Sequence, residues 1–488
     1  MNYKAVTNST DRSNTLMRII IKLLGLSALM LSSCAKQLNI TPKDQVDASM
    51  VFDNTNDLEQ GVLGVYANWQ PEYLMRIASV VSDECRIGTQ NAGVSLTGAG
   101  QNLFRWAFTT STPEIAQPWT NGYTVINTVN LILDAIDDVP VSGSSDSLRK
   151  QQLKGELLTI RAFQHFDLYR VYAYSGVYAP SAYAVPYVTS TNIYSQPARP
   201  TVATFLTQLK EDMTNAESLI GDDPTVTRMN LTSLYALEAR VALYTDDWTT
   251  AIDRAGKAIS AVSLASAADF PSIWTDASTS EVIFKLARNN HSPLRPGDLW
   301  YNIPYNVYLF APSRTLMGLY DTTKDVRYHS YFTTDSTLIA SGQLPDVIVK
   351  YAGTAGAQNL NNLKVIRTGE CYLIRAEAYA RSGNLTAAAA DLNTLRAARI
   401  AGYQPVTFTS VNDLLTALFT ERYKELPYEG HRLYDLKRAG MNIVRQPADW
   451  PQGVNTGTLT PADRYYNIPI PQAEMLANPN IAPNNPGW

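Results

Sequence analysis

The segment ERYKELPYEGHRLYDLKR, residues 421–438, holds the densest group of side chains that could do chemistry. Its glutamates, histidine and aspartate could together act as a general acid and a general base. Helical spacing indicates a simpler role, because Glu421 and Glu425 lie four residues apart, a separation at which side chains meet on a helix. Three further charged residues follow at steps of three: Arg432, Asp435 and Arg438. We predict that these charges pair with their helical neighbours and that the segment is not catalytic.

The histidines give no sign of a metal site. The chain has four of them: His165, His291, His329 and His431. None belongs to an HExxH motif, and no two have the spacing of paired metal ligands. His165 falls among the aromatic residues of a predicted helix, so we expect a packed core side chain. The sequence predicts neither a metal nor another cofactor.

Other catalytic signatures are weak. Gly98-Ala99-Gly100 begins like a dinucleotide-binding loop but lacks the third glycine and a preceding strand. The sequence contains no GxxxxGK and no GxSxG motif. A glycosidase would leave no motif, because its two acids need only lie about 5–10 Å apart in space, but nothing in the sequence favours one. We predict no catalytic residues.

Aromatic residues in two predicted inserts are suited to sugar binding. A sugar ring has a flat C–H face that stacks on Trp or Tyr, while its hydroxyl groups need polar partners beside the ring. We predict ligand contacts at Asp83, Arg86, Asn102, Trp106, Trp300, Tyr301, Tyr305 and Tyr308. The alternative is that these rings pack under their own loops or border an interface with a partner protein.

The N-terminal residues predict export and lipidation. From Met17, an alternative start, MRIIIKLLGLSALMLSSC has a basic flank, an apolar run and small residues at its end, as a secretory signal does. Its end, Leu31-Ser32-Ser33-Cys34, resembles the bacterial lipobox, in which the cysteine becomes the first residue and is acylated. We therefore predict a signal peptide over residues 1–33, a lipid on Cys34 and a mature chain of 34–488. Cys85 and Cys371 could form a disulfide or stay as two small buried residues; the sequence favours burial and leaves pairing open.

The charge balance excludes one class of partner. The whole chain has 40 basic and 44 acidic residues. Removal of residues 1–33 takes away four basic residues and one acid, which leaves 36 and 43 and a formal net charge of −7. The chain has no long basic run and no stripe of basic and aromatic residues, so nucleic acid is not an expected partner.

Internal similarity is the main organising feature of the chain. LYALEARVALYTDDWTTAIDRA, residues 234–255, matches CYLIRAEAYARSGNLTAAAADL, residues 371–392, in kind after a shift of 137. Each predicts a helix, a tight turn and a second helix, which is the tetratricopeptide pattern. A third unit begins at 153–171 and continues in 201–220, and a fourth runs from Leu414 through Arg438. Helices are also predicted over 51–81 and from Trp119, just after Pro118, to Ile136, and long loops over 88–117, 172–200, 261–312, 405–410 and 446–488.

Four segments carry a resemblance to a known family. They are RAFQHFDLYRVY from Arg161, RTGECYLIRAEAYARSGNLTAAAADLNTLRAAR from Arg367, ERYKELPYEGHRLYDLKRAG from Glu421 and IPIPQAEMLANPNIAPNNPGW from Ile468. With the lipobox they resemble, in the expected order, the SusD/RagB family of Bacteroidetes outer-membrane lipoproteins.

The resemblance implies a mainly α-helical fold with four scattered tetratricopeptide units, in which the 421–438 segment is a charged lock between repeat helices. Repeat helices would occupy 153–260 and 367–440, and a loop-rich ligand half 83–117 and 261–350 of one domain, 34–488. It also implies a nutrient-binding protein without enzyme activity that captures a glycan for a SusC-like TonB-dependent transporter. A peptide ligand, a mainly structural or gating role at the transporter and, less favoured, a glycosidase are the alternatives. Members displayed outside the cell often carry acids soon after the lipidated cysteine; here the first is Asp44, so surface or periplasmic display stays open.

Overall fold

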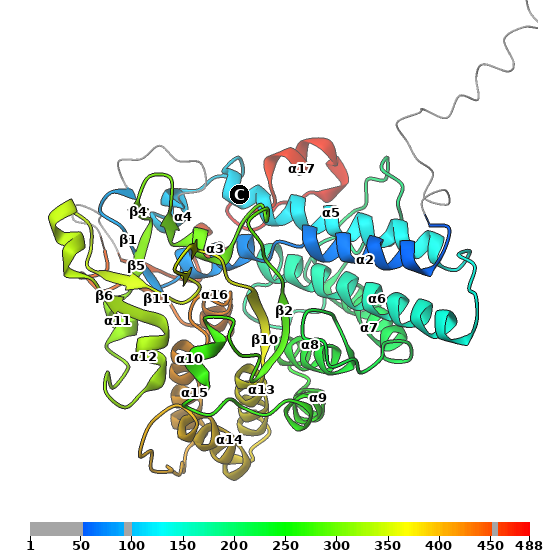
Figure 1. The fold of residues 1–488 in the computed structure, drawn as a ribbon. Helices are drawn as coiled ribbons and strands as arrows, with labels where there is room; N and C mark the ends of the chain where they lie inside the picture. Colours follow the sequence, from blue (N-terminus) through cyan, green and yellow to red (C-terminus); the bar gives the residue numbers. More distant parts are fainter. Residues whose placement is uncertain (1–51, 92–99, 451–456) are drawn as a thin grey trace, which may run out of the picture. The chain divides into compact units, whose positions relative to one another are not determined.

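The computed structural model describes residues 52–91, 100–450 and 457–488 (Figure 1). The predicted signal peptide and the predicted lipidation site, Cys34, lie outside these residues. Among the helices of the described ranges, none combines the length and the apolar character needed to cross a lipid bilayer. The chain from Phe52 to Trp488 forms one unit, and its elements are mainly helices, as predicted.

The elements have the following bounds. The α-helices are α2 (Thr55–Asn68), α3 (Glu72–Val81), α4 (Gln101–Phe104), α5 (Pro113–Ile136), α6 (Ser144–Tyr172), α7 (Val202–Glu217), α8 (Leu231–Tyr244), α9 (Trp248–Ala261), α10 (Phe270–Ile273), α11 (Arg314–Met317), α12 (Val326–Tyr331), α13 (Thr368–Arg381), α14 (Leu385–Ala397), α15 (Val411–Glu425), α16 (Arg432–Arg438) and α17 (Gln472–Ala477). The strands are β1 (Cys85–Ile87), β2 (Val282–Leu286), β3 (Tyr301–Asn302), β4 (Val307–Tyr308), β5 (Phe310–Pro312), β6 (Phe332–Thr334), β7 (Asp346–Ile348), β8 (Gly353–Thr354), β9 (Ala357–Gln358), β10 (Leu363–Arg367), β11 (Ile443–Val444) and β12 (Thr458–Leu459). Short 3₁₀ helices are η3 (Pro296–Leu299), η4 (Ser336–Ser341), η5 (Arg464–Tyr466) and η6 (Pro479–Ile481).

The single helix predicted over 51–81 is two helices, α2 and α3. The side chain of Asn54 caps the start of α2 by accepting hydrogen bonds from the backbone N–H groups of Asn56 and Asp57. The chain leaves the helical conformation at Trp69, two residues before Pro71. Because a proline disfavours helical geometry in the residue before it, Pro71 ends one helix and begins the next.

Helix α5 begins earlier than predicted, and Pro118 lies inside it. A proline inside a helix blocks one turn of backbone hydrogen bonds. Here the hydroxyl of Tyr172 repairs the gap: it donates to the carbonyl of Ile115 (2.6 Å) and accepts from the N–H of Trp119 (2.9 Å). The prediction that Pro118 precedes the helix is therefore wrong, because a side chain from α6 supplies the lost backbone partners.

The two most similar sequence units fold alike. Helices α8 and α13 have the same bounds after the shift of 137 residues, and α9 and α14 begin at matching positions. At the turns, Asp246 and Gly383 both have positive φ, and the following Asp247 and Asn384 both cap the next helix. Helices α6 to α9, then α13 to α15, each pack on the next (Figure 1). Assignment of these pairs to the tetratricopeptide class stays a prediction.

Within the residues that the structure describes, the strands form six two-stranded sheets, two of which join segments far apart in the sequence. These are β1 with β5 and β2 with β10, both antiparallel. Strands β1, β4, β5 and β6 gather at one end of the unit, on the left in Figure 1. Segments predicted as plain loops over 88–117 and 261–312 therefore contain short helices and strands, and the partners of β2 and β5 are too distant in sequence to be predicted.

Candidate functional site

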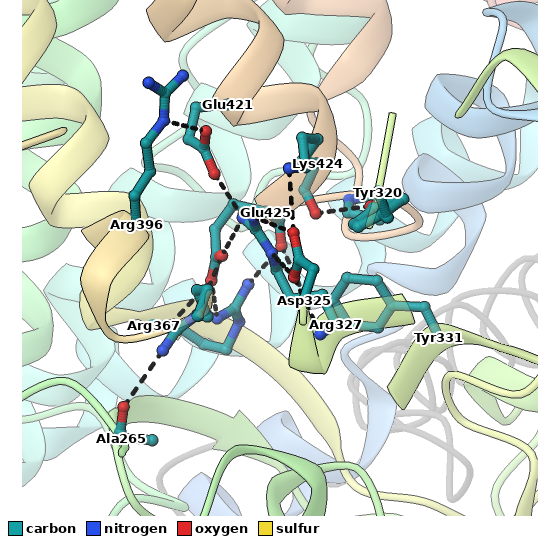
Figure 2. Close-up of polar contacts among 12 residues, drawn as sticks. Ala265, Tyr320, Asp325, Arg327, Tyr331, Arg367, Arg396, Glu421, Lys424 and Glu425 are labelled. Carbon is teal, nitrogen blue, oxygen red and sulfur yellow. Dashed lines mark hydrogen bonds and ion pairs between the residues drawn. The ribbon is translucent and has the colours of Figure 1, made fainter. Parts of the chain in front are cut away.

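The charged segment 421–438 is buried in the protein rather than spread along helix surfaces. Glu421 accepts hydrogen bonds from Arg327 (2.7 Å) and Arg396 (2.6 Å). Glu425 accepts from the guanidinium groups of Arg327, Arg367 and Arg399, each at 3.0 Å (Figure 2). The predicted pairing of the glutamates within their own helix is wrong, because α15 packs against α13 and α14 and its acids face arginines from other segments.

The second half of that segment follows the prediction in part. Asp435 pairs with Arg438, three residues on, at 2.9 Å, as predicted, and also with Arg422 at 2.9 Å. Arg432 instead makes a two-pronged contact with Asp83, both N–O distances being 2.7 Å. The charges thus connect segments that are more than 300 residues apart in sequence.

The electrostatics of this buried cluster are those of a structural lock. Burial alone would raise the pKa of Glu425, but Arg399, Arg367 and Arg327 hold that pKa well below its ordinary value of 4.5. Glu421 and Glu425 have side chains at most 1% exposed, and arginines occupy their oxygens. A general acid must exchange a proton with a bound substrate, so this cluster is not suited to catalysis.

The histidines and cysteines lie where a structural role requires them. His165 is buried, stacks on the ring of Tyr187 with 3.8 Å between centroids, and accepts a hydrogen bond from the N–H of Val188. Burial lowers the pKa of His165 to about 3, so the ring is neutral. Cys85 and Cys371 are both buried free thiols. Within the described ranges, no group of three or more His, Cys, Asp and Glu side chains could hold a metal ion.

Four of the predicted ligand residues are buried. Asp83 is held by Arg432, and Arg86 forms an ion pair with Asp346. Trp106 is 7% exposed, and its indole N–H donates to the carbonyl of Val81. Trp300 is 1% exposed and packs against Phe310 and Tyr428. Because a ring that is 1% exposed presents no face to a ligand, Trp300 cannot serve as a stacking platform in the candidate site.

The other four predicted residues lie closer to solvent. Asn102 and Tyr305 are exposed, the latter by 58%, and neither lines the hollows described below. Tyr301 and Tyr308 are half-buried and face each other across the β3–β4 hairpin, with 4.6 Å between ring centroids. Of the eight predicted residues, the structure therefore brings Tyr301, Tyr308 and the buried Trp300 to the lining of one hollow.

These two tyrosines border a hollow of about 120 Å³, which we call the tyrosine hollow. It is lined by Gly297, Trp300, Tyr301, Tyr308, Thr333, Asp335, Val347, Ile348, Val349, Ala352, Gln358 and Asn359. The amide of Asn359 donates to the carbonyl of Tyr301 (2.8 Å), and Gln343 accepts from the N–H of Tyr308 (2.9 Å). These hydrogen bonds fix the backbone of both tyrosines. The amide groups of Gln358 and Asn359 and the hydroxyl group of Thr333 line the same hollow as the two rings.

A second hollow of about 260 Å³, the arginine hollow, lies near the first. It is lined by Arg86, Ile87, Gly88, Thr89, Arg105, Leu344, Ala448, Asp449 and Trp450. Leu344 borders this hollow and Val347 the tyrosine hollow, so only two residues of the chain, Pro345 and Asp346, separate their walls. The N–H of Gly88 donates to the carbonyl of Leu309, and a Cβ at Gly88 would lie 2.0 Å from the carbonyl oxygen of Tyr308, so this close approach requires glycine.

Trp450 and Arg445 were not among the predicted site residues. The buried guanidinium of Arg445 donates to the carbonyls of Val80, Val81 and Ser82 and so satisfies the C-terminal end of α3. Three rings pack around it: Phe104, Trp106 and Trp450. Burial lowers the pKa of Arg445 to about 10. The only sign of this site in the sequence was a tryptophan in a loop-like tail. No local pattern shows that Trp450 lies beside Arg86 in the folded protein.

A wider hollow, about 580 Å³, lies elsewhere, along α15. This helix groove is lined by Asp83, Thr315, Leu319, Arg381, Asn412, Leu415, Thr416, Phe419, Thr420, Tyr423, Arg432, Arg438, Ala439 and Met441. Asp83 borders it while Arg86, three residues on, borders the arginine hollow. The segment before β1 therefore runs between the helical half and the strand-rich end.

Comparison with known protein families gives two matches. Residues 322–488 match a family described as the SusD family, and residues 42–243 match one described as starch-binding and associating with the outer membrane. Two relatives are proteins of Formosa agariphila. SusD-like protein P38 is 22% identical over 480 residues, 86% of this chain and 91% of the relative. SusD-like protein P2 is 32% identical over 149 residues, 28% of this chain and 29% of the relative.

Solved structures share the fold over nearly the whole described chain. A SusD superfamily protein of Bacteroides thetaiotaomicron is 25% identical, with a TM-score of 0.77, over 89% of this chain and 100% of its own. A putative sugar binding protein of Bacteroides vulgatus is 26% identical, with a TM-score of 0.74, over 90% and 99%. The helical frame and its strand-rich end are therefore a shared architecture.

Proposed function

Because this chain belongs to the SusD/RagB family of outer-membrane-associated carbohydrate-binding proteins, we propose that it is a lipoprotein that captures glycans and breaks no bond in them. The observation that supports ligand capture is the tyrosine hollow. Two tyrosine rings lie half-exposed beside amide and hydroxyl groups, which matches the needs of a sugar: a flat apolar face and hydrogen-bonding partners at its edge.

Alanine at Tyr301 and Tyr308 should weaken glycan binding by at least about tenfold, because a lost stacking ring costs about 1.4 kcal/mol or more. Both rings are half-buried at the surface, so the melting temperature should change little. The measurement is a glycan array on the chain without residues 1–34, followed by calorimetry with the best ligand. Tyr194→Ala is the matched control, since Tyr194 is 86% exposed and borders no hollow described above. Unchanged affinity in the double variant would contradict this site.

The carboxylates of the two hollows favour binding over catalysis. Each hollow has one acid among its described lining residues, Asp335 or Asp449. Asp335 accepts hydrogen bonds from the backbone and hydroxyl of Thr337. Asp449 accepts from the hydroxyl of Ser313 and from Arg314 and Thr315. A glycosidase needs two free carboxyl groups flanking one bond; release of reducing ends from any bound oligosaccharide would favour the enzyme alternative.

We propose a SusC-like TonB-dependent transporter as the partner, with the helix groove along α15 as part of the contact surface. The groove combines apolar side chains, such as Leu415 and Phe419, with arginines, a mixture common at protein interfaces. An alternative role at the transporter is gating, for which ligand binding by this protein would not be needed. Uptake in cells that carry the Tyr301/Tyr308 double alanine variant separates the two: loss indicates capture, and survival indicates gating. If the ligand is a peptide, the protein should bind no glycan on the array and should bind peptides instead.

Substitution of Cys34 by alanine should remove the protein from the outer-membrane fraction. The predicted acyl chains on Cys34 are the expected anchor, since each buried methylene contributes about 0.8 kcal/mol to membrane binding. Cell fractionation with immunoblotting measures the effect. Cys85→Ala is the matched control, because Cys85 is a buried thiol in the folded protein. Continued outer-membrane fractionation of the Cys34→Ala protein would contradict the lipid anchor.

A further inference from the structure

The arginine hollow is surrounded by more cations than anions. Two arginines line it, Arg86 and Arg105. Two more lie beside its lining: Arg314, whose charge acts on Arg86, and Arg445, whose guanidinium lies 5.0 Å from the centre of the Trp450 ring. Two carboxylates oppose them, Asp346 and Asp449. Four positive groups against two negative ones leave a formal charge of +2 here, on a chain whose formal net charge is −4. The local charge therefore opposes that of the protein.

Both carboxylates are already occupied. Asp346 pairs with Arg86 and also accepts from the hydroxyl of Thr334. Asp449 accepts hydrogen bonds from the backbone N–H groups of Arg314 (2.8 Å) and Thr315 (3.3 Å) and from two hydroxyl groups. It thus caps the first turn of α11 and does not contact the guanidinium of an arginine. Neither acid is available to neutralise a further cation.

Two of the arginines have no such partner. The exposed guanidinium groups of Arg105 and Arg314 form no ion pair and no side-chain hydrogen bond with the part of the chain that the structure describes. The pKa of Arg86 is lowered mainly by burial, and the positive charge of Arg314 lowers it further. The chain continues from the hollow into residues 92–99 and 451–456, whose sequences, AGVSLTGA and PQGVNT, contain no ionisable side chain. Those segments can therefore supply no missing anion.

We propose that the arginine hollow binds the acidic group of an anionic sugar residue, a carboxylate or a sulfate ester, while the neighbouring tyrosine hollow holds an adjacent ring of the same oligosaccharide. Guanidinium groups present a planar fork of donors that matches both acids. Trp450 borders the hollow and offers the aromatic ring that a sugar also needs. This inference rests on the proposed glycan-binding function and narrows its ligand class to acidic glycans.

The test uses pairs of oligosaccharides that differ in charge alone. One pair is oligogalacturonate and its methyl ester; the other is a sulfated galactan oligosaccharide and its desulfated form. Calorimetry on the chain without residues 1–34 should show at least one acidic member binding about tenfold tighter than its neutral partner. That preference should fall as salt rises, because salt screens charged contacts near the surface. Comparison of the two pairs tells carboxylate from sulfate recognition.

Variants locate the effect. Arg105→Gln with Arg314→Gln should bring the acid-to-neutral affinity ratio close to one. Lys210→Gln is the matched control, since it removes one exposed cation of α7, far along the chain from either hollow. It should leave the ratio as it is in the unmodified protein. Circular dichroism checks that the folded helical content is equal in all proteins.

Two results would overturn the inference alone: neutral members that bind as tightly as acidic ones in both pairs, or an acidic preference that survives in the double arginine variant. Tighter binding of hexaglutamate than of any acidic sugar would replace the glycan by an acidic peptide and would also overturn it. Absence of binding to every glycan on the array, neutral and acidic, would instead contradict the proposed function itself. The two failures are therefore distinguishable.

Discussion

Substitution of Glu425 by glutamine should lower the free energy of unfolding by about 3–5 kcal/mol, as removal of one partner from a buried ion cluster does. The carboxylate of Glu425 lies between Arg327, Arg367 and Arg399, and none of these four side chains has measurable exposure. Glutamine keeps the shape but removes the charge, which leaves three buried guanidinium groups short of one anion. Urea denaturation followed by circular dichroism measures the loss.

The matched control is Glu217→Gln. Glu217 also pairs with an arginine, Arg254, at 2.6 Å, but its side chain is 31% exposed. Because solvent screens such a pair, this change should cost no more than about 1 kcal/mol. Equal stability of the two variants would show that the arginines around Glu425 need no central anion, and the structural role assigned to the cluster would fall.

The same cluster predicts how the stability difference depends on pH. The pKa of Glu425 in the folded protein lies below its ordinary value of 4.5, so the unfolded chain takes up this proton first as the pH falls. The carboxylate therefore stabilises the fold fully above that value and progressively less below it. The difference in unfolding free energy between the unmodified protein and Glu425→Gln should be constant between about pH 5 and 8 and shrink in acid. A difference that grows in acid would contradict the sign.

Trp300→Ala should cost about 3–5 kcal/mol of stability, the usual loss for a large aromatic removed from a core. Trp300 is 1% exposed, with Tyr428 5.0 Å away and Phe310 6.4 Å away between ring centroids. The surrounding rings come from separate segments and cannot collapse fully into the space. Thermal and urea unfolding measure the effect, and glycan affinity of the protein that remains folded is the second readout.

Tyr305→Ala is the comparison for this second change. Tyr305 lies in the same aromatic stretch but is 58% exposed, so its loss should alter stability by no more than about 0.5 kcal/mol. Trp300→Phe keeps an aromatic ring in place and should be milder than alanine. If Trp300→Ala kept its stability but lost glycan binding, Trp300 would return to the list of ligand residues from which its burial removes it.

The arrangement of the two hollows explains why the sequence could point to one of them and not to the other. The stretch from Trp300 to Tyr308 stands out because four aromatic residues and two asparagines occur within nine positions. The hairpin that pairs Tyr301 with Tyr308 is local, so a sequence pattern could identify it. The arginine hollow joins residues near 86, 105, 344 and 449. No local pattern connects such positions, because a hollow of that kind exists only after distant strands have paired.

The ion pairs of the charged segment 421–438 also depend on contacts between distant segments. Helical spacing identified Glu421 and Glu425 as members of one helix, and the family resemblance implied a lock between helices. Spacing also predicted partners within the helix. The arginines that pair with these glutamates instead lie on α12, on β10, on α14 and just after α14. A charge pairs with whichever opposite charge packing brings near in a low-dielectric interior, and packing is not encoded at a spacing of four residues.

The sequence by itself determined the helix pairs of the 137-residue internal match and their turns, because helical periodicity and capping are properties of neighbouring residues. Matching positive-φ residues and caps at Asp246-Asp247 and Gly383-Asn384 confirm how local that information is. Only the tertiary structure decided which aromatic residues border a hollow. Trp300 and Tyr301 are adjacent in sequence, yet one is core and the other lines a hollow with part of its ring in solvent. Exposure depends on what distant segments cover, and no neighbouring residue records that.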